Sequence, residues 1–326
     1  MKRLNVLLIA LFVFFEAYAT DSWVLKNFPD SVNISGLAIN AANEIFVIAS
    51  YQSDSGAWPV GVAYRSSDDG NNWIQIVPTG SIPEIMDILI DYEDDIYLGI
   101  WFGGLYKSED NGATWEEKGN GMSNNLPVYL SINSVGVIYA GHFLGGGIDY
   151  SLNGGEEWHS TNHPTNTSII GLGIGPDDYI FSDGGLYSPD GGESWHYNNS
   201  GLSDVVLINQ VCYAFNNTNQ VFLGTVEGIY YLSSIDAAWV NVFSINASVR
   251  DIIVSSQNTI YAATYADVFY SMNNGQDWEN INDQFTGSPP QRFCFDNEGF
   301  LWAASGNEVY KSQHIVNGLH EDFANQ

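Results

Sequence analysis

An eight-residue frame that ends in tryptophan recurs along the chain and limits the folds that are open to it. Its form is Ser-x-Asp-x-Gly-x-x-Trp, with Asn replacing Asp in two copies, and five copies occupy residues 66–73, 108–115, 151–158, 188–195 and 271–278. A sixth copy, residues 232–239, keeps Trp239 but has Ser234 and Asp236 in place of Asp and Gly. Repetition of this kind indicates one supersecondary unit used many times.

Each position of the frame has a physical role in a tight turn. The Asp or Asn side chain accepts hydrogen bonds from the backbone amides of its own turn, and Gly supplies a positive φ. Trp opens the next strand and packs against a neighbouring hairpin. We assign these structural roles, and no catalytic role, to Asp68, Trp73, Asp110, Trp115, Asn153, Trp158, Asp190, Trp195, Asn273 and Trp278.

The frame resembles the Asp-box, also called the BNR or sialidase-type repeat, and the resemblance covers essentially the whole mature chain. It implies that each frame closes the turn between the third and fourth strands of a β-propeller blade. The chain is also similar to the secreted, seven-bladed, photosystem-assembly-factor-like propellers of bacteria. A sialidase is not expected, because those enzymes use an arginine cluster and six blades, whereas the mature chain has three arginines, Arg65, Arg250 and Arg292.

Alternation of apolar and polar residues predicts four half-buried strands in each repeat. In the second repeat they cover residues 85–91, 95–101, 104–108 and 115–118, and the same order recurs at 128–133, 137–143 and 147–151. Consecutive tryptophans of the frame are 37 to 44 residues apart, which suits one four-stranded blade per repeat.

The two ends of the chain supply the parts of one further blade. Residues 23–26 form a fourth strand without its first three, and residues 292–296, 300–305 and 309–312 form three strands without a fourth. We therefore predict an all-β, seven-bladed β-propeller with four-stranded blades, closed by an N-terminal strand that completes the C-terminal blade. This single domain covers residues 20–312, and residues 313–326 form a polar tail.

The N-terminus has the pattern of a signal peptide. Two basic residues precede an apolar run from Leu4 to Phe15, and Ala17-Tyr18-Ala19 follows as a cleavage signal. The run is shorter than the roughly 20 residues of a membrane span. We predict a leader over residues 1–19, cleavage near Ala19, and export to the periplasm, the cell surface or the medium.

The charge of the chain excludes some partners. The formal net charge is −29, and such a field repels nucleic acid and anionic lipid while favouring solubility. Cys212 and Cys294, the two cysteines, fall on the innermost strands of the fifth and seventh blades. A whole blade separates them, so we predict two buried free thiols and no disulfide. We expect no cofactor, no bound metal, no membrane insertion and a monomer.

One rim of the predicted propeller gathers the candidate binding residues. Loops between second and third strands share the face opposite the tryptophan-ended turns and carry aromatic and polar side chains, while two arginines lie on channel-lining strands. The predicted ligand-binding residues are Trp58, Trp101, Phe102, His142, Phe143, Tyr265, Arg250 and Arg292. Aromatic rings and polar groups on one rim suit a saccharide or a peptide. Packing at blade corners would explain the same aromatics, and pairing with acids the same arginines.

Two functions from different classes fit this arrangement. The one we favour is a secreted, non-catalytic propeller that binds an extracellular glycan, peptide or protein partner through these loops. The alternative is a glycoside hydrolase or lyase that acts on an extracellular polysaccharide with the rim carboxylates Asp183, Glu227 and Asp267. Whether the protein is an enzyme therefore stays open at this point.

Overall fold

Antiparallel strands account for nearly all the regular structure of the described residues. The computed structural model describes residues 23–26, 28–29, 32–53, 58–77, 82–164, 168–206, 209, 211–245, 247–282, 285 and 289–316. The predicted leader, residues 1–19, lies outside them, as does the tail from residue 317. Among the described residues, none belongs to a helix long and apolar enough to cross a membrane.

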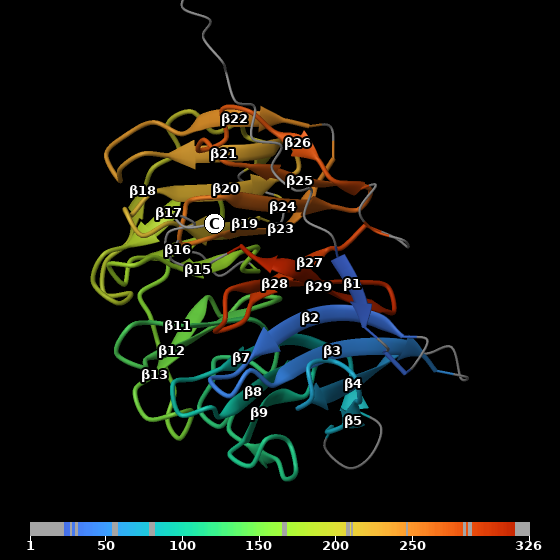
Figure 1. The fold of residues 1–326 in the computed structure, drawn as a ribbon. Coiled ribbons are helices and arrows are strands. Elements are labelled where there is room, and N and C mark those ends of the chain that lie inside the picture. The colour runs from blue at the N-terminus through green and yellow to red at the C-terminus, as the bar shows by residue number, and fades with distance from the viewer. Residues whose placement is uncertain are drawn as a thin grey trace, which may run out of the picture.

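The strands form seven sheets around a central axis, and Figure 1 looks onto this ring. We number these blades from β2 onward. Blade 1 contains β2 (Asn33–Ile39), β3 (Ile45–Gln52), β4 (Pro59–Ser66) and β5 (Ile74–Gln75), with β6 (Ile82–Pro83) beside β4. Blade 2 contains β7 (Ile85–Ile90), β8 (Ile96–Ile100), β9 (Gly104–Ser108) and β10 (Glu116–Glu117). Blade 3 contains β11 (Pro127–Ile132), β12 (Ile138–His142), β13 (Ile148–Ser151) and β14 (His159–Ser160).

The remaining four blades repeat the same order. Blade 4 contains β15 (Leu172–Ile174), β16 (Ile180–Ser182), β17 (Leu186–Ser188) and β18 (His196–Tyr197). Blade 5 contains β19 (Cys212–Phe215), β20 (Val221–Thr225), β21 (Gly228–Leu232) and β22 (Val240–Ser244). Blade 6 contains β23 (Val249–Val254), β24 (Ile260–Thr264), β25 (Val268–Ser271) and β26 (Glu279–Asn280). Blade 7 contains β27 (Arg292–Phe295), β28 (Phe300–Ser305), β29 (Glu308–Ile315) and β1 (Trp23–Lys26).

The predicted seven-bladed propeller is therefore confirmed, including its closure by the N-terminal strand. β1 pairs with β29 from Trp23 opposite Ser312 to Lys26 opposite Val309. The first strands contact one another in sequence around the axis, and β27 contacts β2, so they enclose a central channel. β29 continues to Ile315, beyond residue 312 where the strand was predicted to end.

The burial of the second strands differs from the prediction of half-buried strands. β8, β12, β20 and β24 are buried at every residue. Each blade packs against a neighbour on both faces, so side chains of both orientations enter apolar clusters. One such cluster joins Phe46 and Ile48 of blade 1 to Ile96 and Leu98 of blade 2. The core of the protein lies between blades.

The tryptophan-ended frames form the predicted turns. In blade 2, Asp110 Oδ1 accepts the Thr114 amide (2.7 Å), and the Trp115 indole donates to the Gly112 carbonyl (3.2 Å). Trp115 Nε1 also reaches the Ile76 carbonyl of blade 1, and Trp158 Nε1 donates to the Lys118 carbonyl of blade 2 (2.7 Å). Trp115 and Trp158 therefore bind their hairpins to the preceding blade, in line with the predicted packing of these tryptophans on a neighbouring hairpin.

A second repeated turn joins first to second strands. The sequence analysis predicted a turn between the strands at residues 85–91 and 95–101 but not its recurrence in every blade. In blade 2 it spans Asp91 to Asp95, where Asp91 Oδ1 accepts the Glu93 and Asp95 amides (3.0 and 2.9 Å). In every blade the fourth residue of this turn has a positive φ; these residues are Asn43, Asp94, Gly136, Asp178, Asn219, Asn258 and Gly299. Asn, Asp and Gly tolerate that conformation best.

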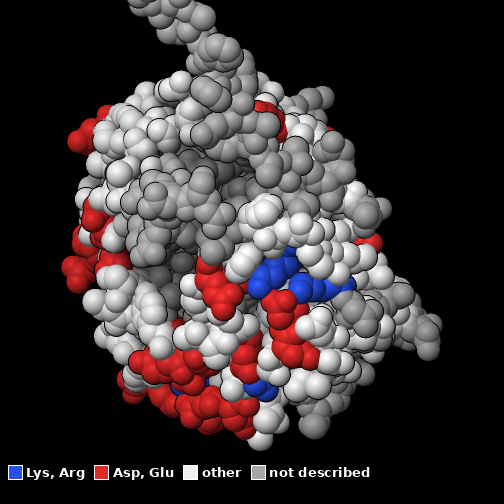
Figure 2. Space-filling view, in the orientation of Figure 1, with Lys and Arg blue, Asp and Glu red and all other residues white. Residues whose placement is uncertain are grey.

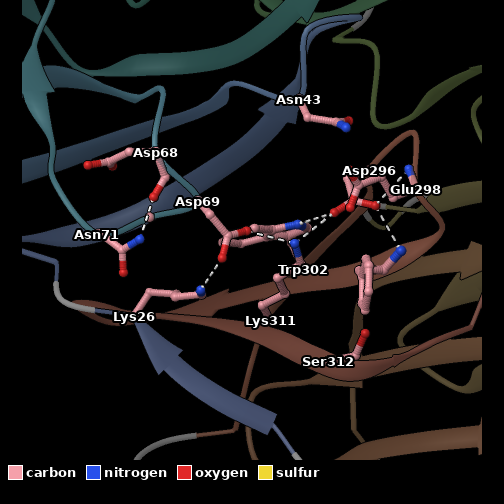
Figure 3. A network of polar contacts seen from close by, with 12 residues as sticks. Lys26, Asn43, Asp68, Asp69, Asn71, Asp296, Glu298, Trp302, Lys311 and Ser312 are labelled. Atoms are coloured by element: carbon pink, nitrogen blue, oxygen red, sulfur yellow. Dashed lines mark hydrogen bonds and ion pairs between the residues drawn. The ribbon is translucent and has the colours of Figure 1, made fainter.

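Charged side chains connect the closing blade to blade 1 (Figure 3). Lys26 Nζ of β1 lies 2.6 Å from Asp69 Oδ2, and Lys311 Nζ of β29 lies 2.7 Å from Asp69 Oδ1. Lys311 also pairs with Asp296 Oδ2 (3.3 Å), which accepts the Trp302 indole (3.0 Å). Partial burial raises the pKa of Asp69, but the two lysine ammonium groups lower it by more, so the pKa lies below its ordinary value. Asp69 therefore holds both closing strands.

Candidate functional site

One mouth of the central channel is a concave feature that all seven blades line. The cavity has a volume of about 670 Å³, and the first strands or the residues that precede them line it in every blade. Glu84, Ile169 and Val211 lie at or just before the start of these strands, so this mouth is at the end of the channel where the first strands begin. The tryptophan-ended turns lie at the other end of the blades.

Aromatic side chains gather beside this mouth. Trp101 and Phe102 occupy the turn after β8, and Phe143 follows β12; the Trp101 ring centroid lies 5.3 Å from that of Phe102 and 5.1 Å from that of Phe143. The turn is held because the Trp101 amide donates to the Glu84 carbonyl (2.9 Å). Trp101 and Phe143 line the channel mouth.

An apolar groove adjoins the mouth and shares Glu84, Met86 and Trp101 with it. Its volume is about 760 Å³, and Trp58 and Phe102 complete its walls. Trp58 is 67% exposed and Phe102 is 61% exposed, unusually open for rings of this size. Large contiguous apolar patches on a protein surface commonly mark binding sites. Mouth and groove together bring Trp58, Trp101, Phe102 and Phe143 into one continuous surface.

Two arginines place positive charge at the mouth of an otherwise acidic protein. The cations at positions 26, 65, 107, 118 and 311 form ion pairs with carboxylates elsewhere, and Figure 2 shows blue side chains lying beside red ones. Arg250 and Arg292 line the mouth. The Arg250 guanidinium lies 4.5 Å from the ring centre of Tyr265, which is exposed. Arg292 donates to the carbonyls of Ser35 (2.7 Å) and Gln291 (2.8 Å).

Two acids of the channel wall were missed by the sequence analysis. Asp87 accepts the Leu130 amide of blade 3 (2.7 Å), and Asp251 accepts the Phe293 amide of blade 7 (2.7 Å). Burial raises the pKa of each carboxyl to about 6, although Arg292 opposes the shift. The available signal was one aspartate at the same place in two apolar strands, Ile-Met-Asp-Ile-Leu-Ile and Val-Arg-Asp-Ile-Ile-Val.

His142 does not lie on this surface. Its side chain is fully buried, and its Nε2 lies 2.8 Å from Asp149 Oδ2, also fully buried. Asp149 accepts the Ser123 amide as well (2.6 Å). The pair therefore fixes the loop before β11 to blade 3, and we leave His142 out of the candidate site.

Each of the three rim carboxylates is bound within or beside its own blade. Asp183 accepts the Ile170 amide (2.9 Å), and burial raises the pKa of this carboxyl to about 6. Glu227 accepts the hydroxyls of Ser203 (2.7 Å) and Tyr230 (3.0 Å). Asp267 accepts the side-chain amides of Asn280 and Asn282 (2.9 and 2.7 Å). These contacts give each carboxylate a role in its own loop.

Both cysteines are free and lie on first strands, β19 and β27, as predicted, but each residue is half-buried where a buried thiol was predicted. Burial raises the pKa of the Cys212 and Cys294 thiols to about 12. Cys212 lies in the channel wall, but at neutral pH its sulfur is a thiol and not a nucleophilic thiolate. We assign it no chemistry.

These features define a seven-bladed β-propeller with an aromatic-lined channel mouth. No protein-family model and no curated protein matches the chain. Solved structures with the same fold include the extracellular domain of the putative one component system BT4673 from B. thetaiotaomicron (12% identity, TM-score 0.72). They also include catalytically inactive virginiamycin B lyase from Staphylococcus aureus with Quinupristin (12%, 0.70) and YCF48 bound to D1 peptide (13%, 0.69).

The extent of these matches differs. The BT4673 match covers 91% of this chain but 40% of that one, so this chain spans less than half of that domain. The other two cover 90% and 93% of this chain and 99% and 98% of theirs. At such identities the likeness shows a shared fold.

Proposed function

We propose that the protein is an exported, non-catalytic propeller that binds an extracellular partner, a glycan, peptide or protein, at the channel mouth and the adjoining groove. The observation that carries this proposal is the continuous surface of Trp58, Trp101, Phe102 and Phe143, drawn from three blades. Exposed rings stack on sugar faces or cover apolar side chains, and polar groups at the mouth fix orientation. Tyr265 and Arg250 extend the surface on the other side of the channel.

Two further observations favour binding over catalysis. Asp183, Glu227 and Asp267 each accept hydrogen bonds from residues in or beside their own loops. These bonds give each carboxylate a structural role and do not pair it with another of the three. Among solved propellers of this fold, YCF48 is bound to D1 peptide. A propeller of this kind can therefore present a peptide-sized binding surface.

The same proposal includes the repeat family, the export and the oligomeric state of the chain. The hairpin geometry supports membership of the Asp-box repeats, because Asp or Asn binds its own turn and Trp the preceding blade. We propose cleavage near Ala19, export, one propeller domain over residues 20–312 and a monomeric mature protein. The wider surface is acidic and suits an extracellular partner that is neutral or basic.

A pull-down from extracellular fractions and a glycan array test the proposal. Wild type is compared with the double variant Trp58→Ala/Phe102→Ala, and with Tyr197→Ala, which removes an equally exposed ring from the outer strand β18. We expect a partner whose binding weakens at least about tenfold in the double variant and is unchanged in Tyr197→Ala. Absence of any partner in both assays, or equal binding by the double variant, would contradict the proposal.

The alternative function is cleavage of an extracellular polysaccharide. Asp183 favours it most, because its pKa is near 6 and His163 Nε2 lies 3.6 Å from its Oδ2. Turnover of a polysaccharide by wild type that is lost in both Asp183→Asn and Glu227→Gln would establish this function in place of binding.

A further inference from the structure

A smaller cavity lies between blades 4 and 5, at the opposite end of the blades from the channel mouth. Its volume is about 210 Å³. Its walls come from the turn after β15, the turn after β19 and the turn after β21, which is the degenerate sixth copy of the tryptophan-ended frame. We call it the blade 4–5 pocket. It shares no residue with the channel mouth or the groove.

Between two other pairs of neighbouring blades, a tyrosine hydroxyl reaches into the equivalent space. Between blades 2 and 3, Tyr97 Oη lies 3.3 Å from the Gly154 carbonyl oxygen. Between blades 3 and 4, a Cβ atom placed on Gly191 would lie 3.4 Å from Tyr139 Oη. In each case the second residue of the second strand meets the glycine that precedes the Gly of the next hairpin.

Both partners of that contact have changed between blades 4 and 5. Phe181 stands at the tyrosine position and has no hydroxyl, and Ile235 stands at the glycine position. Among described residues 232–239, none has a positive φ, so the hairpin takes a different path from its relatives. The space that a hydroxyl and a left-handed turn fill between blades 2 and 3 and between blades 3 and 4 is left as a pocket here.

The chemistry of the pocket walls selects its occupant. Three rings, Tyr179, Phe181 and Phe215, line it, and the Phe181 and Phe215 centroids are 5.4 Å apart. One carboxylate, Asp177, stands among them and accepts a hydrogen bond from the Asn219 side-chain amide. Aromatic faces and a carboxylate both attract a cation with an apolar surface, whereas an anion meets Asp177 and a chain of net charge −29.

We propose that the blade 4–5 pocket binds an alkylammonium group. Two sources of this group are a lysine side chain of a partner and a small quaternary ammonium compound, since both present a positively charged nitrogen bonded to carbon. The pocket volume suits a group of this size and excludes a folded partner from entering further. This proposal is independent of the function proposed for the channel mouth.

Calorimetric titration of the full mature chain tests the pocket with three probes: choline, its neutral isostere 3,3-dimethylbutan-1-ol, and Nα-acetyl-lysine amide. We expect choline or the lysine amide to bind at least about fivefold more tightly than the neutral alcohol. The tighter of the two cations identifies the source of the ammonium group. Equal affinity for the neutral alcohol, or no binding of any probe, would overturn the proposal.

Two pairs of variants localise the site. Phe181→Tyr introduces the hydroxyl found in blades 2 and 3 and should abolish binding without unfolding the chain. Tyr187→Phe lies outside the pocket walls and should leave binding unchanged. Asp177→Asn should weaken binding by roughly threefold or more, while Asp178→Asn removes the same charge one residue away, where it binds Ser134, and should change little. Equal losses in Asp177→Asn and Asp178→Asn would contradict a local carboxylate contact.

Discussion

At the scale of single residues, the hairpin frame depends on its serine as much as on its aspartate. Ser66 Oγ accepts the Gly70 amide (2.9 Å) and donates to Asp68 Oδ1 (3.0 Å), and both bonds recur with Ser108, Ser151, Ser188 and Ser271. These serines are buried, so each hydroxyl satisfies an amide that water cannot reach. Blade 5, which lacks the Asp and Gly, has Leu232 at this position.

Adjacent serines in the first hairpin test this role. Ser66→Ala leaves the Gly70 amide without its acceptor inside the protein, and we expect a loss of about 1–2 kcal/mol in the free energy of unfolding. Ser67 is exposed, so Ser67→Ala should stay within about 0.5 kcal/mol of wild type. Urea unfolding followed by tryptophan fluorescence measures both. Equal stabilities of the two variants would show that the buried hydroxyl is not needed.

At the scale of strands, the sequence predicted where each strand lies along the chain better than it predicted how far the strand is buried. The strand predicted at residues 292–296 is found at Arg292–Phe295, because turn residues mark its ends. The prediction of half-buried strands was wrong for the second strands, since packing of one blade on another cannot be seen within one repeat. Asp87 and Asp251 were missed for the same reason: their amide partners, Leu130 and Phe293, belong to the next blade.

The channel-wall aspartates should make stability depend on pH. Burial raises the pKa of Asp251 from 3.8 to about 6, so between these values the folded state holds a proton that the unfolded state releases. The stability contributed by this group therefore falls as pH rises through that interval. Asp251→Asn cannot titrate, so its free energy of unfolding relative to wild type should rise by about 1–2 kcal/mol from pH 4 to pH 7. Urea unfolding at each pH measures the difference. Exposed Glu157, changed to Gln, is the control, and a flat difference for Asp251→Asn would refute the effect.

At the scale of the whole molecule, the ends of the chain were more informative than its middle. Trp23 and the three C-terminal strands predicted one shared blade, and hence the count of seven, because a lone fourth strand must find a partner. The candidate surface was predicted in part: Trp58, Trp101, Phe102 and Phe143 converge, whereas His142 is buried. Whether a loop residue points outward depends on the turn that carries it, and spacing alone does not determine this.

Closure of the ring should depend on backbone pairing more than on charge. A chain without residues 23–26 exposes the edge of β29 and loses the contact of Trp23 with Phe285, whose ring centroids are 4.9 Å apart. We expect its Tm to fall by at least about 5 °C, measured by calorimetry, and its apparent size to grow with concentration, measured by size-exclusion chromatography.

Lys26→Met removes one partly exposed ion pair and should lower the free energy of unfolding by less than about 1 kcal/mol. A synthetic peptide of residues 22–29 should restore the Tm of the shortened chain by pairing with β29, and a scrambled peptide should not. An unchanged Tm after the deletion, or equal effects of the two peptides, would mean that β1 does not close the ring.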